Sequence, residues 1–291
     1  MTTVMPRPAI AFRPAALRRY VRSPKGTVLL LFLGLFVLAA PAVGLQAAMR
    51  SVLVPSLTAG AMDLVLLRYI RGTWSIPTAA VLTGMIIGFV LAPQAPMPVA
   101  VATAAIAIAG KHLLRTRLAN VFNPAALALV AAGIFFSAGQ SWWGALPDTS
   151  FFGPLLLISI GLFIVDRIKK LPLVFSFLGA YFALFTVSCF FGNAASAAEI
   201  FRSPDIEAAL FFAFFMVDDP PTCPIRPWEQ VVCGVIVATA AWGIFVFNGA
   251  LYFLPAGLLV GNAYAGASRA IREQLRARKR NGRGASGGSL A

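Results

Sequence analysis

The chain has few acidic residues, few cysteines and a single histidine. Its 291 residues include 10 Asp and Glu, and the three cysteines are Cys189, Cys223 and Cys233. Zinc and iron–sulfur sites need several Cys or His ligands at paired spacings, which these cysteines and His112 lack. We therefore expect no metal centre and interpret the cysteines as small apolar side chains.

Charged residues are scarce as a class, and long apolar runs replace them. Hydrophobic residues make up 59% of the chain, charged residues 12%, and the mean hydropathy is +0.83. A soluble domain of this size cannot bury so much apolar surface, whereas a bilayer covers it. The sequence predicts an all-α integral membrane protein with about ten transmembrane helices. The apolar segments are 27–45, 51–70, 75–93, 97–114, 122–138, 151–168, 172–191, 205–218, 231–248 and 250–268.

The net charge of +14 comes from basic residues that cluster at the two ends and in alternate gaps between these segments. With both termini in the cytoplasm, every Lys and Arg except Arg50 and Arg202 lies on the inner side, as the positive-inside rule requires. We therefore place the chain in a bacterial-type inner (plasma) membrane. We expect its basic tails to meet anionic membrane lipid, and we expect no nucleic-acid partner because no soluble module hosts one.

Three regions follow from this pattern. Residues 1–26 form a cytoplasmic basic segment, 27–268 the membrane domain, and 269–291 a cytoplasmic basic tail. The first apolar run is longer than the core of a cleavable signal peptide. The end of the tail is rich in Gly, Ser and Arg, so we predict that the tail is disordered.

A weak internal similarity suggests two repeats. The stretches 121–130 and 252–261 share Phe-x-Pro-Ala followed by an apolar run, at an offset of 131 residues. Five segments per half give the halves, about 27–138 and 151–268, opposite topologies, and such inverted repeats place their site where broken helices meet. Chance similarity between apolar segments is the competing explanation.

The first candidate site is Asn120-Val-Phe-Asn123-Pro124. Proline suits the first turn of a helix, and Asn123 before it suits the N-cap. The alternative is that this helix N-terminus binds an anionic or hydrogen-bonding ligand.

The second candidate site is Asp218-Asp219-Pro-Pro-Thr222. The two carboxylates either form a solvated turn or line a cavity that binds a flavin ring, a quinone or a cation. Neither a base nor a nucleophile accompanies them, so we predict no catalytic residue for hydrolysis.

Other polar residues lie within or beside the apolar segments. Asn262, among Gly and Ala, either permits close helix contact or contributes to the site. Asp63 either pairs with Arg68 or binds a proton, and Asp166 is expected to pair locally with Arg167. The pair at 142–143, Trp-Trp, is typical of a headgroup-level anchor, and an aromatic docking face is the alternative.

Several motifs together resemble one family. They are Lys111-His-x-x-Arg115, the Asn-Val-Phe-Asn-Pro-Ala-Ala stretch at 120–126, the Phe-Met-Val-Asp-Asp-Pro-Pro-Thr stretch at 215–222, Phe-Leu-Pro-Ala-Gly at 253–257, and Gly-Asn at 261–262. Their order and spacing are similar to those of the shared family of the Rnf complex D subunit and the B subunit of the Na⁺-translocating NADH:quinone reductase (Nqr). The resemblance covers roughly residues 60–265.

The resemblance implies a ten-helix, inverted-repeat subunit that passes electrons through flavin in a complex coupled to Na⁺ or H⁺ movement. Its partners would be other membrane subunits and flavin or iron–sulfur subunits. Family members carry covalent FMN on a threonine in an S-G-A-T motif, which this chain lacks; the nearest outer-loop threonine, Thr149, has a different context. We therefore expect riboflavin, FMN or quinone to bind non-covalently. The expected cofactor-binding residues are Asn120, Asn123, Asp218, Asp219, Thr222 and Asn262.

Two other functions fit the same scaffold. A redox-independent transporter of small solutes or ions is the first, because inverted repeats with broken helices are a transporter design. A structural anchor for a flavoprotein or ferredoxin-like partner is the second.

Overall fold

The computed structural model describes residues 23–72, 74–116, 120–147, 149, 151–191 and 194–287. These residues are predominantly helical and contain no β-strand, only two isolated bridges. This confirms the predicted all-α class. The helices are α2 (Pro24–Val43), α3 (Leu45–Arg71), α4 (Thr78–Val90), α5 (Met97–Leu113), α6 (Pro124–Phe136), the 3₁₀ turn η1 (Trp143–Ala145), α7 (Phe152–Arg167), α8 (Leu171–Phe191), α9 (Ala194–Glu199), α10 (Asp205–Phe215), α11 (Pro227–Asn248) and α12 (Phe253–Gly287).

Several helices have the length and composition of membrane spans. Four qualify fully among the described residues, and α4, α5 and α6 are shorter apolar helices. Large apolar side chains such as Val37, Leu57 and Phe190 point outward, which suits a lipid environment. These helices give the chain the character of an integral membrane protein. The four are Lys25–Val43, Leu45–Ile70, Leu171–Phe191 and Pro227–Asn248.

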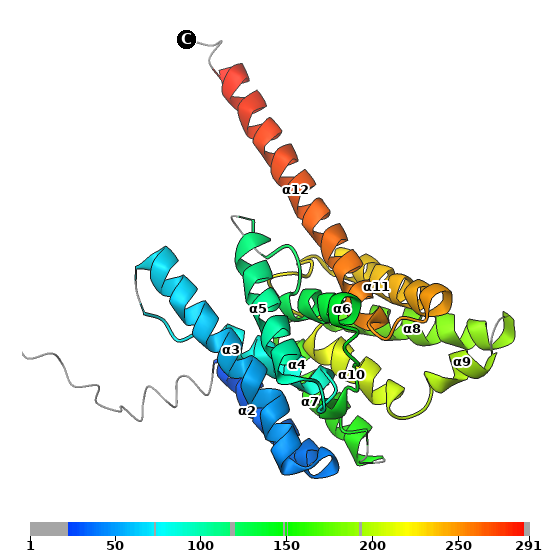
Figure 1. Ribbon diagram of the computed structural model, residues 1–291. Coiled ribbons are helices and arrows are strands. Elements are labelled where there is room, and N and C mark those ends of the chain that lie inside the picture. Colours follow the sequence, from blue (N-terminus) through cyan, green and yellow to red (C-terminus); the bar gives the residue numbers. More distant parts are fainter. Residues whose placement is uncertain are drawn as a thin grey trace, which may run out of the picture.

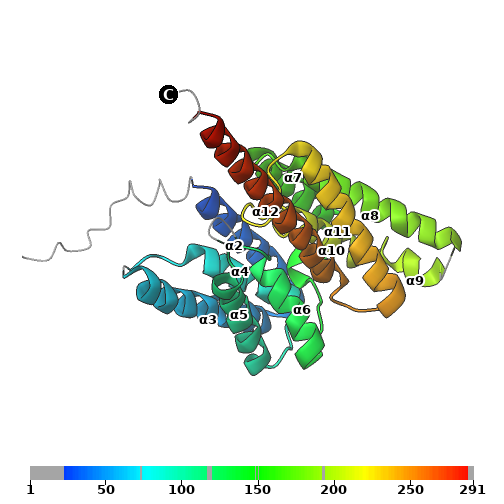
Figure 2. The same ribbon diagram turned by 90° about the horizontal axis from the view of Figure 1, so that it is seen from above.

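The first five helices and the remaining ones lie on opposite sides of the molecule. In Figure 2, α2–α6 occupy one side and α7–α11 the other. Helix α3 packs on α4 and α5, whereas α11 packs on α8 and α12. Contact across the division includes α6 against α12, and the far end of α12 projects away from the body (Figure 1).

Glycines allow α3 and α4 to pack closely together. A Cβ added at Gly84 would lie 2.4 Å from the Ser56 Cα, and one added at Gly88 would lie 2.5 Å from the Ser51 carbonyl oxygen. Because those atoms belong to the backbone of α3, they cannot rotate away. Small residues here therefore set the distance between the two helices.

Aromatic rings fill the core, and they include the tandem tryptophans. Trp142 and Trp143 are 7% and 4% exposed, and the indole N–H of Trp143 donates to the Gly88 carbonyl at 2.7 Å. The two indoles also form edge contacts with Phe89 and Phe211. The predicted headgroup-level anchor and the aromatic docking face are therefore both wrong, because buried rings reach neither lipid headgroups nor a partner.

The C-terminal tail also differs from its prediction. We expected disorder over 269–291, but α12 continues as a helix to Gly287. Ala, Arg, Glu, Gln and Leu dominate 269–280, and these residues have high helix propensity. The helix that begins at Phe253 therefore extends into the tail. Residues 288–291 and most of the basic segment 1–26 lie outside the described residues.

Candidate functional site

Asn123 forms the N-cap of α6. Its side-chain Oδ1 accepts from the Ala126 N–H at 3.0 Å, and Pro124 occupies the first helical position. The extended backbone of Asn123, with φ −64° and ψ 121°, is the usual conformation for a capping residue. Residues 123 and 124 alone therefore account for the start of α6. The predicted N-cap role of Asn123 is confirmed.

The same asparagine connects α6 to the second part of the chain. Its backbone N–H donates to Oδ1 of Asn262 on α12 at 2.7 Å, and its Nδ2 donates to the Met216 carbonyl at 3.3 Å. Asn123 and Asn262 are 4% and 1% exposed. Three motifs that lie between 46 and 139 residues apart in the sequence therefore meet at one buried point, where the start of α6, the end of α10 and α12 come together.

The carboxylates of the second motif lie in the loop after α10. Asp218 is 4% exposed and its Oδ2 has no hydrogen-bond partner, whereas Oδ2 of Asp219 accepts from the Thr222 hydroxyl at 3.1 Å. Burial raises the pKa of Asp219 from 3.8 to about 6, and the Thr222 hydrogen bond partly offsets this rise. The solvated-turn interpretation is therefore wrong for Asp218, whose carboxyl faces the protein interior.

Arg269 joins the two candidate motifs, although its position in the sequence indicates only the basic tail. Its guanidinium donates to the Pro221 carbonyl at 2.7 Å and to the carbonyls of Asn120 and Thr222 at 3.5 Å. An arginine can fan five N–H donors over several acceptors, which suits this role. Its position directly after the tenth apolar segment, on the same helix, was the available signal.

Lys170 is a second basic residue near this site, although its position in the sequence indicates only membrane topology. It is 7% exposed and its Nζ donates to the Pro224 carbonyl. Its charge interacts with Asp218 and with the Cys223 thiol, whose pKa burial raises to about 12. Cys223 therefore stays protonated, as expected for a structural cysteine.

Further acceptor atoms without partners occur at the start of α11. Oε2 of Glu229 and Oε1 of Gln230 are buried and unpaired, although Arg272 contacts the other oxygen of Glu229 and Gln230 donates to the Ile225 carbonyl at 3.0 Å. With Oδ2 of Asp218, three unpaired buried acceptors occur within residues 218–230. Unpaired buried acceptors favour a ligand that brings hydrogen-bond donors.

A cavity of about 180 Å³ adjoins this site. The loop before α6 forms one wall, where Arg115 and Asn120 form an isolated antiparallel bridge, and α12 forms the other. Its lining includes Asn120 and Arg269, so the cavity shares residues with the contacts described above. The lining residues are Thr116, Asn120, Val121, Gly266, Arg269, Ala270 and Glu273.

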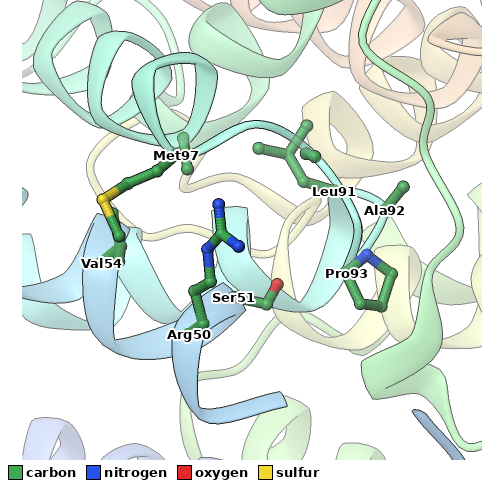
Figure 3. Close-up of a pocket in the computed structure, with 9 residues that line it drawn as sticks. Arg50, Ser51, Val54, Leu91, Ala92, Pro93 and Met97 are labelled. Atoms are coloured by element: carbon green, nitrogen blue, oxygen red, sulfur yellow. The ribbon is translucent and has the colours of Figure 1, made fainter. Parts of the chain in front are cut away.

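A second pocket lies near the N-terminal end of α3. Figure 3 shows the Arg50 guanidinium pointing toward the segment that joins α4 to α5, with Met97 beside it. The cavity volume is about 10 Å³, which is roughly the space of one water molecule. It shares no residue with the candidate site, and we assign it no ligand.

Asp63 pairs with residues other than those predicted. Its carboxylate accepts from Lys111 Nζ at 2.8 and 2.9 Å and lies 2.7 Å from Nε2 of His112, so α5 rather than α3 supplies the partners. Arg68 instead donates to the Gly72 carbonyl and lies over the Trp74 ring. The predicted Asp63–Arg68 pair is wrong because helix packing brings the end of α5 closer to the carboxylate.

Asp166 and Thr149 both form local contacts. Asp166 forms an exposed ion pair with Lys169 at 3.5 Å, and Arg167 follows it in the last turn of α7. The Thr149 hydroxyl donates to the Leu146 carbonyl at 2.7 Å within the same turn. Its neighbours at 148 and 150 lie outside the described residues. Thr149 therefore forms a turn apart from the Asn123 contacts.

Comparison with known proteins assigns no family. No protein-family model matches the chain, and no curated protein matches its sequence. The site is therefore defined by its own contacts. It consists of a buried carboxylate, two facing asparagines and an arginine that spans two loops, and this arrangement is suited to binding a polar, donor-rich ligand.

Proposed function

We propose that the chain is the membrane subunit of an Rnf- or Nqr-like electron-transport complex and binds a flavin non-covalently beside Asp218. The observation that supports this most is the meeting of Asn123, Asn262 and the Met216 carbonyl, two residues before Asp218, whose Oδ2 is buried and unpaired. These are the motifs that carry the resemblance to that family. Partner subunits with flavin or iron–sulfur centres would deliver and remove the electrons, and Na⁺ or H⁺ movement would be coupled to them.

The unpaired acceptors favour flavin over quinone. A flavin offers a ring N–H and, in riboflavin or FMN, ribityl hydroxyls, whereas an oxidised quinone offers only carbonyl acceptors. Asp218 Oδ2 and Gln230 Oε1 would accept from such donors, while the Arg269 and Lys170 donors already bond to backbone carbonyls. The flavin would supply one- and two-electron chemistry when bound, and the protein's dipoles would tune it.

In this proposal, the residues of the chain orient the ligand and exclude water. Asn123 and Asn262 fix the start of α6 against α12, and Arg269 holds the loop before α6 against the loop after α10. The buried environment strengthens every hydrogen bond to the ligand because water does not compete for the same groups.

The proposal includes ten membrane crossings in two inverted repeats with both termini in the cytoplasm. Each of the ten apolar segments overlaps one helix, and α6 and α12 carry Pro124 and Pro255 in their first turns, 131 residues apart. Helices shorter than a full span, such as α6 and α10, are typical of the broken helices of inverted-repeat membrane proteins. The packing of α6 on α12 supports a site where the repeats meet.

The experiment is purification of the full chain in mild detergent from cells grown with adequate riboflavin. We expect flavin absorbance at the protein peak and release of the flavin into the supernatant when the protein is denatured. Asp218→Asn should lower the flavin content several-fold, whereas Asp166→Asn, at an exposed carboxyl, should not. Flavin that stays on the denatured polypeptide would contradict non-covalent binding, and wild-type protein without flavin would contradict the proposal.

A redox-independent transporter is the second candidate, and the buried polar cluster at Asp63 favours it. Asp63 is 1% exposed and shares its carboxylate between Lys111 and His112 inside an apolar bundle. Intramembrane ionisable clusters commonly mark ion or proton pathways. Ion flux into proteoliposomes without any electron donor, abolished by Asp63→Asn, would favour transport over electron transfer.

A further inference from the structure

The last turn of α5 places two basic side chains on one carboxylate of α3. Lys111 Nζ donates to the two oxygens of Asp63 at 2.9 and 2.8 Å, and Nε2 of His112 lies 2.7 Å from Oδ1. A carboxyl group whose two oxygens both accept from an ammonium group is ionised and can only accept hydrogen bonds. Nε2 of His112 therefore carries the hydrogen of this contact, because two acceptor atoms do not approach so closely.

This assignment identifies Nδ1 as the ring atom of His112 that can change its protonation state. In a neutral imidazole one nitrogen donates and the other keeps a lone pair, so a hydrogen on Nε2 leaves the lone pair on Nδ1. Histidine is the side chain whose charge normally changes between about pH 5 and pH 8. A second proton can therefore enter at Nδ1 without breaking the hydrogen bond to Asp63.

The charges beside the ring are balanced before that proton arrives. The Asp63 carboxylate and the Lys111 ammonium group compensate each other, so the cluster is neutral as long as His112 is neutral. Asp63 and the partial negative charge at the C-terminal end of α5 favour a positive imidazole, whereas Lys111 opposes it. The proton affinity of His112 therefore depends on two neighbours that act in opposite directions.

The other groups around α5 do not change charge in the same pH range. Helices α4 and α6, which pack on α5, contain no titratable side chain. On α3, which also packs on α5, Arg68 is directed to the Gly72 carbonyl and the Trp74 ring. Arginine and tyrosine keep their charge states between about pH 5 and pH 9. The remaining titratable groups of α3 and of the described part of the loop after α5 are Arg50, Tyr69, Arg71 and Arg115.

The cluster has a buried side and an accessible side. The Asp63 side chain is 2% exposed, whereas the side chains of Lys111 and His112 are 20% and 12% exposed. The carboxylate that stabilises the proton is thus enclosed, while the imidazole that takes it up reaches the surface of the molecule. This arrangement allows exchange of a proton with the surroundings without exposing the carboxylate.

We propose that Asp63, Lys111 and His112 form a proton-binding site, in which His112 takes up one proton from water at Nδ1 and releases it again. Uptake converts the neutral ring into an imidazolium whose Nε2–H still donates to Asp63. Because Lys111 already binds both carboxylate oxygens, a proton fits this site and a metal cation does not. The inference does not depend on flavin binding, and it gives the transport alternative above a defined ligand.

The chain contains a single histidine, so a histidine signal reports on this site alone. The test is ¹⁵N NMR of the full chain, labelled with [¹⁵N]histidine, purified in detergent through a tag without histidine, and titrated from about pH 9 to about pH 5. The shifts of the two ring nitrogens distinguish both neutral tautomers from the imidazolium. We expect the hydrogen on Nε2 at high pH and one reversible, single-proton transition at Nδ1 within this range.

Two substitutions should move that transition in opposite directions. Lys111→Met removes the neighbouring positive charge and should raise the proton affinity of His112 about tenfold. Asp63→Asn removes the negative charge and should lower it at least tenfold. Asp166→Asn, at an exposed carboxyl on another helix, is the matched control and should leave the transition unchanged.

Four results would overturn the proposal. A wild-type imidazole that keeps one charge state over the whole range, or that carries its hydrogen on Nδ1 at high pH, would exclude proton binding in this geometry. A transition that Lys111→Met or Asp63→Asn does not move would show that His112 titrates independently of the cluster. The first two results come from the wild type and the third from Lys111→Met, so the test remains decisive even if Asp63→Asn does not fold.

Discussion

The backbone N–H of Asn123 donates to the side-chain Oδ1 of Asn262 at 2.7 Å across 139 residues of sequence. The backbone N–H at the start of a helix has no partner within that helix, and here another helix supplies it. Asn123 caps α6 with its side chain, and Asn262 on α12 accepts a hydrogen bond from the backbone N–H of Asn123. This contact fixes α6 against α12 at the candidate site.

Removing the Asn262 side chain should destabilise the protein. Asn262→Ala leaves the buried Asn123 N–H without a partner, which costs about 1–3 kcal/mol. The measurement is the Tm in detergent. Asn248→Ala, at an exposed asparagine that ends α11, should change stability by less than about 0.5 kcal/mol. Equal effects of the two substitutions would show that the interhelical hydrogen bond contributes nothing.

The effect of a glycine-to-alanine substitution on stability should differ between a close helix contact and an open surface. Gly84→Ala places a methyl group 2.4 Å from the Ser56 Cα, and relieving that overlap should cost about 1–3 kcal/mol or more. Gly179→Ala, where no atom lies within 4 Å, should be neutral or stabilising by about 0.5–1 kcal/mol. Thermal unfolding of both variants tests the α3–α4 distance. A neutral Gly84→Ala would mean that these helices pack further apart.

The Asp63 cluster should respond asymmetrically to substitution. Asp63→Asn leaves Lys111 and His112 without their shared carboxylate, which should cost about 3–5 kcal/mol. Lys111→Met with Asp63→Asn together should recover part of that loss, since no lysine then remains unpaired. A double-mutant cycle measured by thermal unfolding gives the coupling. Additive losses would rule out an energetic coupling between the two residues.

Elements that depend on local pattern could be predicted from the sequence. The apolar segments coincide with helices, and the Asn123-Pro124 start of α6 and the Asp205 start of α10 lie within about two residues of their predicted positions. Helix periodicity, proline and capping interactions act between residues that are close in sequence, so they can be recognised from the sequence alone. The membrane character follows from composition in the same way.

Contacts between distant helices could not be predicted. The motifs at Asn123, Asn262 and Asp218 were recognised individually, but Arg269 was assigned to a tail and Lys170 to a topology signal. Asp63 was paired within its own helix, although Lys111 and His112 bind it from α5. Trp142 and Trp143 were placed at the membrane interface because composition alone does not distinguish a lipid-facing ring from a buried one. Each of these errors concerns which residues a side chain contacts, and those contacts depend on tertiary packing.

The stability of the protein should depend on pH through Asp219. Burial raises the pKa of Asp219 from 3.8 to about 6, so the folded state holds this proton more tightly than the unfolded chain. The contribution of this group to stability therefore falls as pH rises from about 4 through about 6. Between pH 5 and pH 8, the Tm of the wild type should fall by about 3 °C more than that of Asp219→Asn. Parallel curves would show that the carboxyl titrates normally.

Titration of the purified, flavin-depleted protein with riboflavin tests the central claim most directly. Quenching of flavin fluorescence reports binding, with ubiquinone-1 added as a competitor and Asp218→Asn as the variant. The account predicts saturable quenching in the wild type, at least tenfold weaker binding in Asp218→Asn, and little competition by quinone. Equal affinity of the wild type and Asp218→Asn for riboflavin, or no quenching in either, would contradict it.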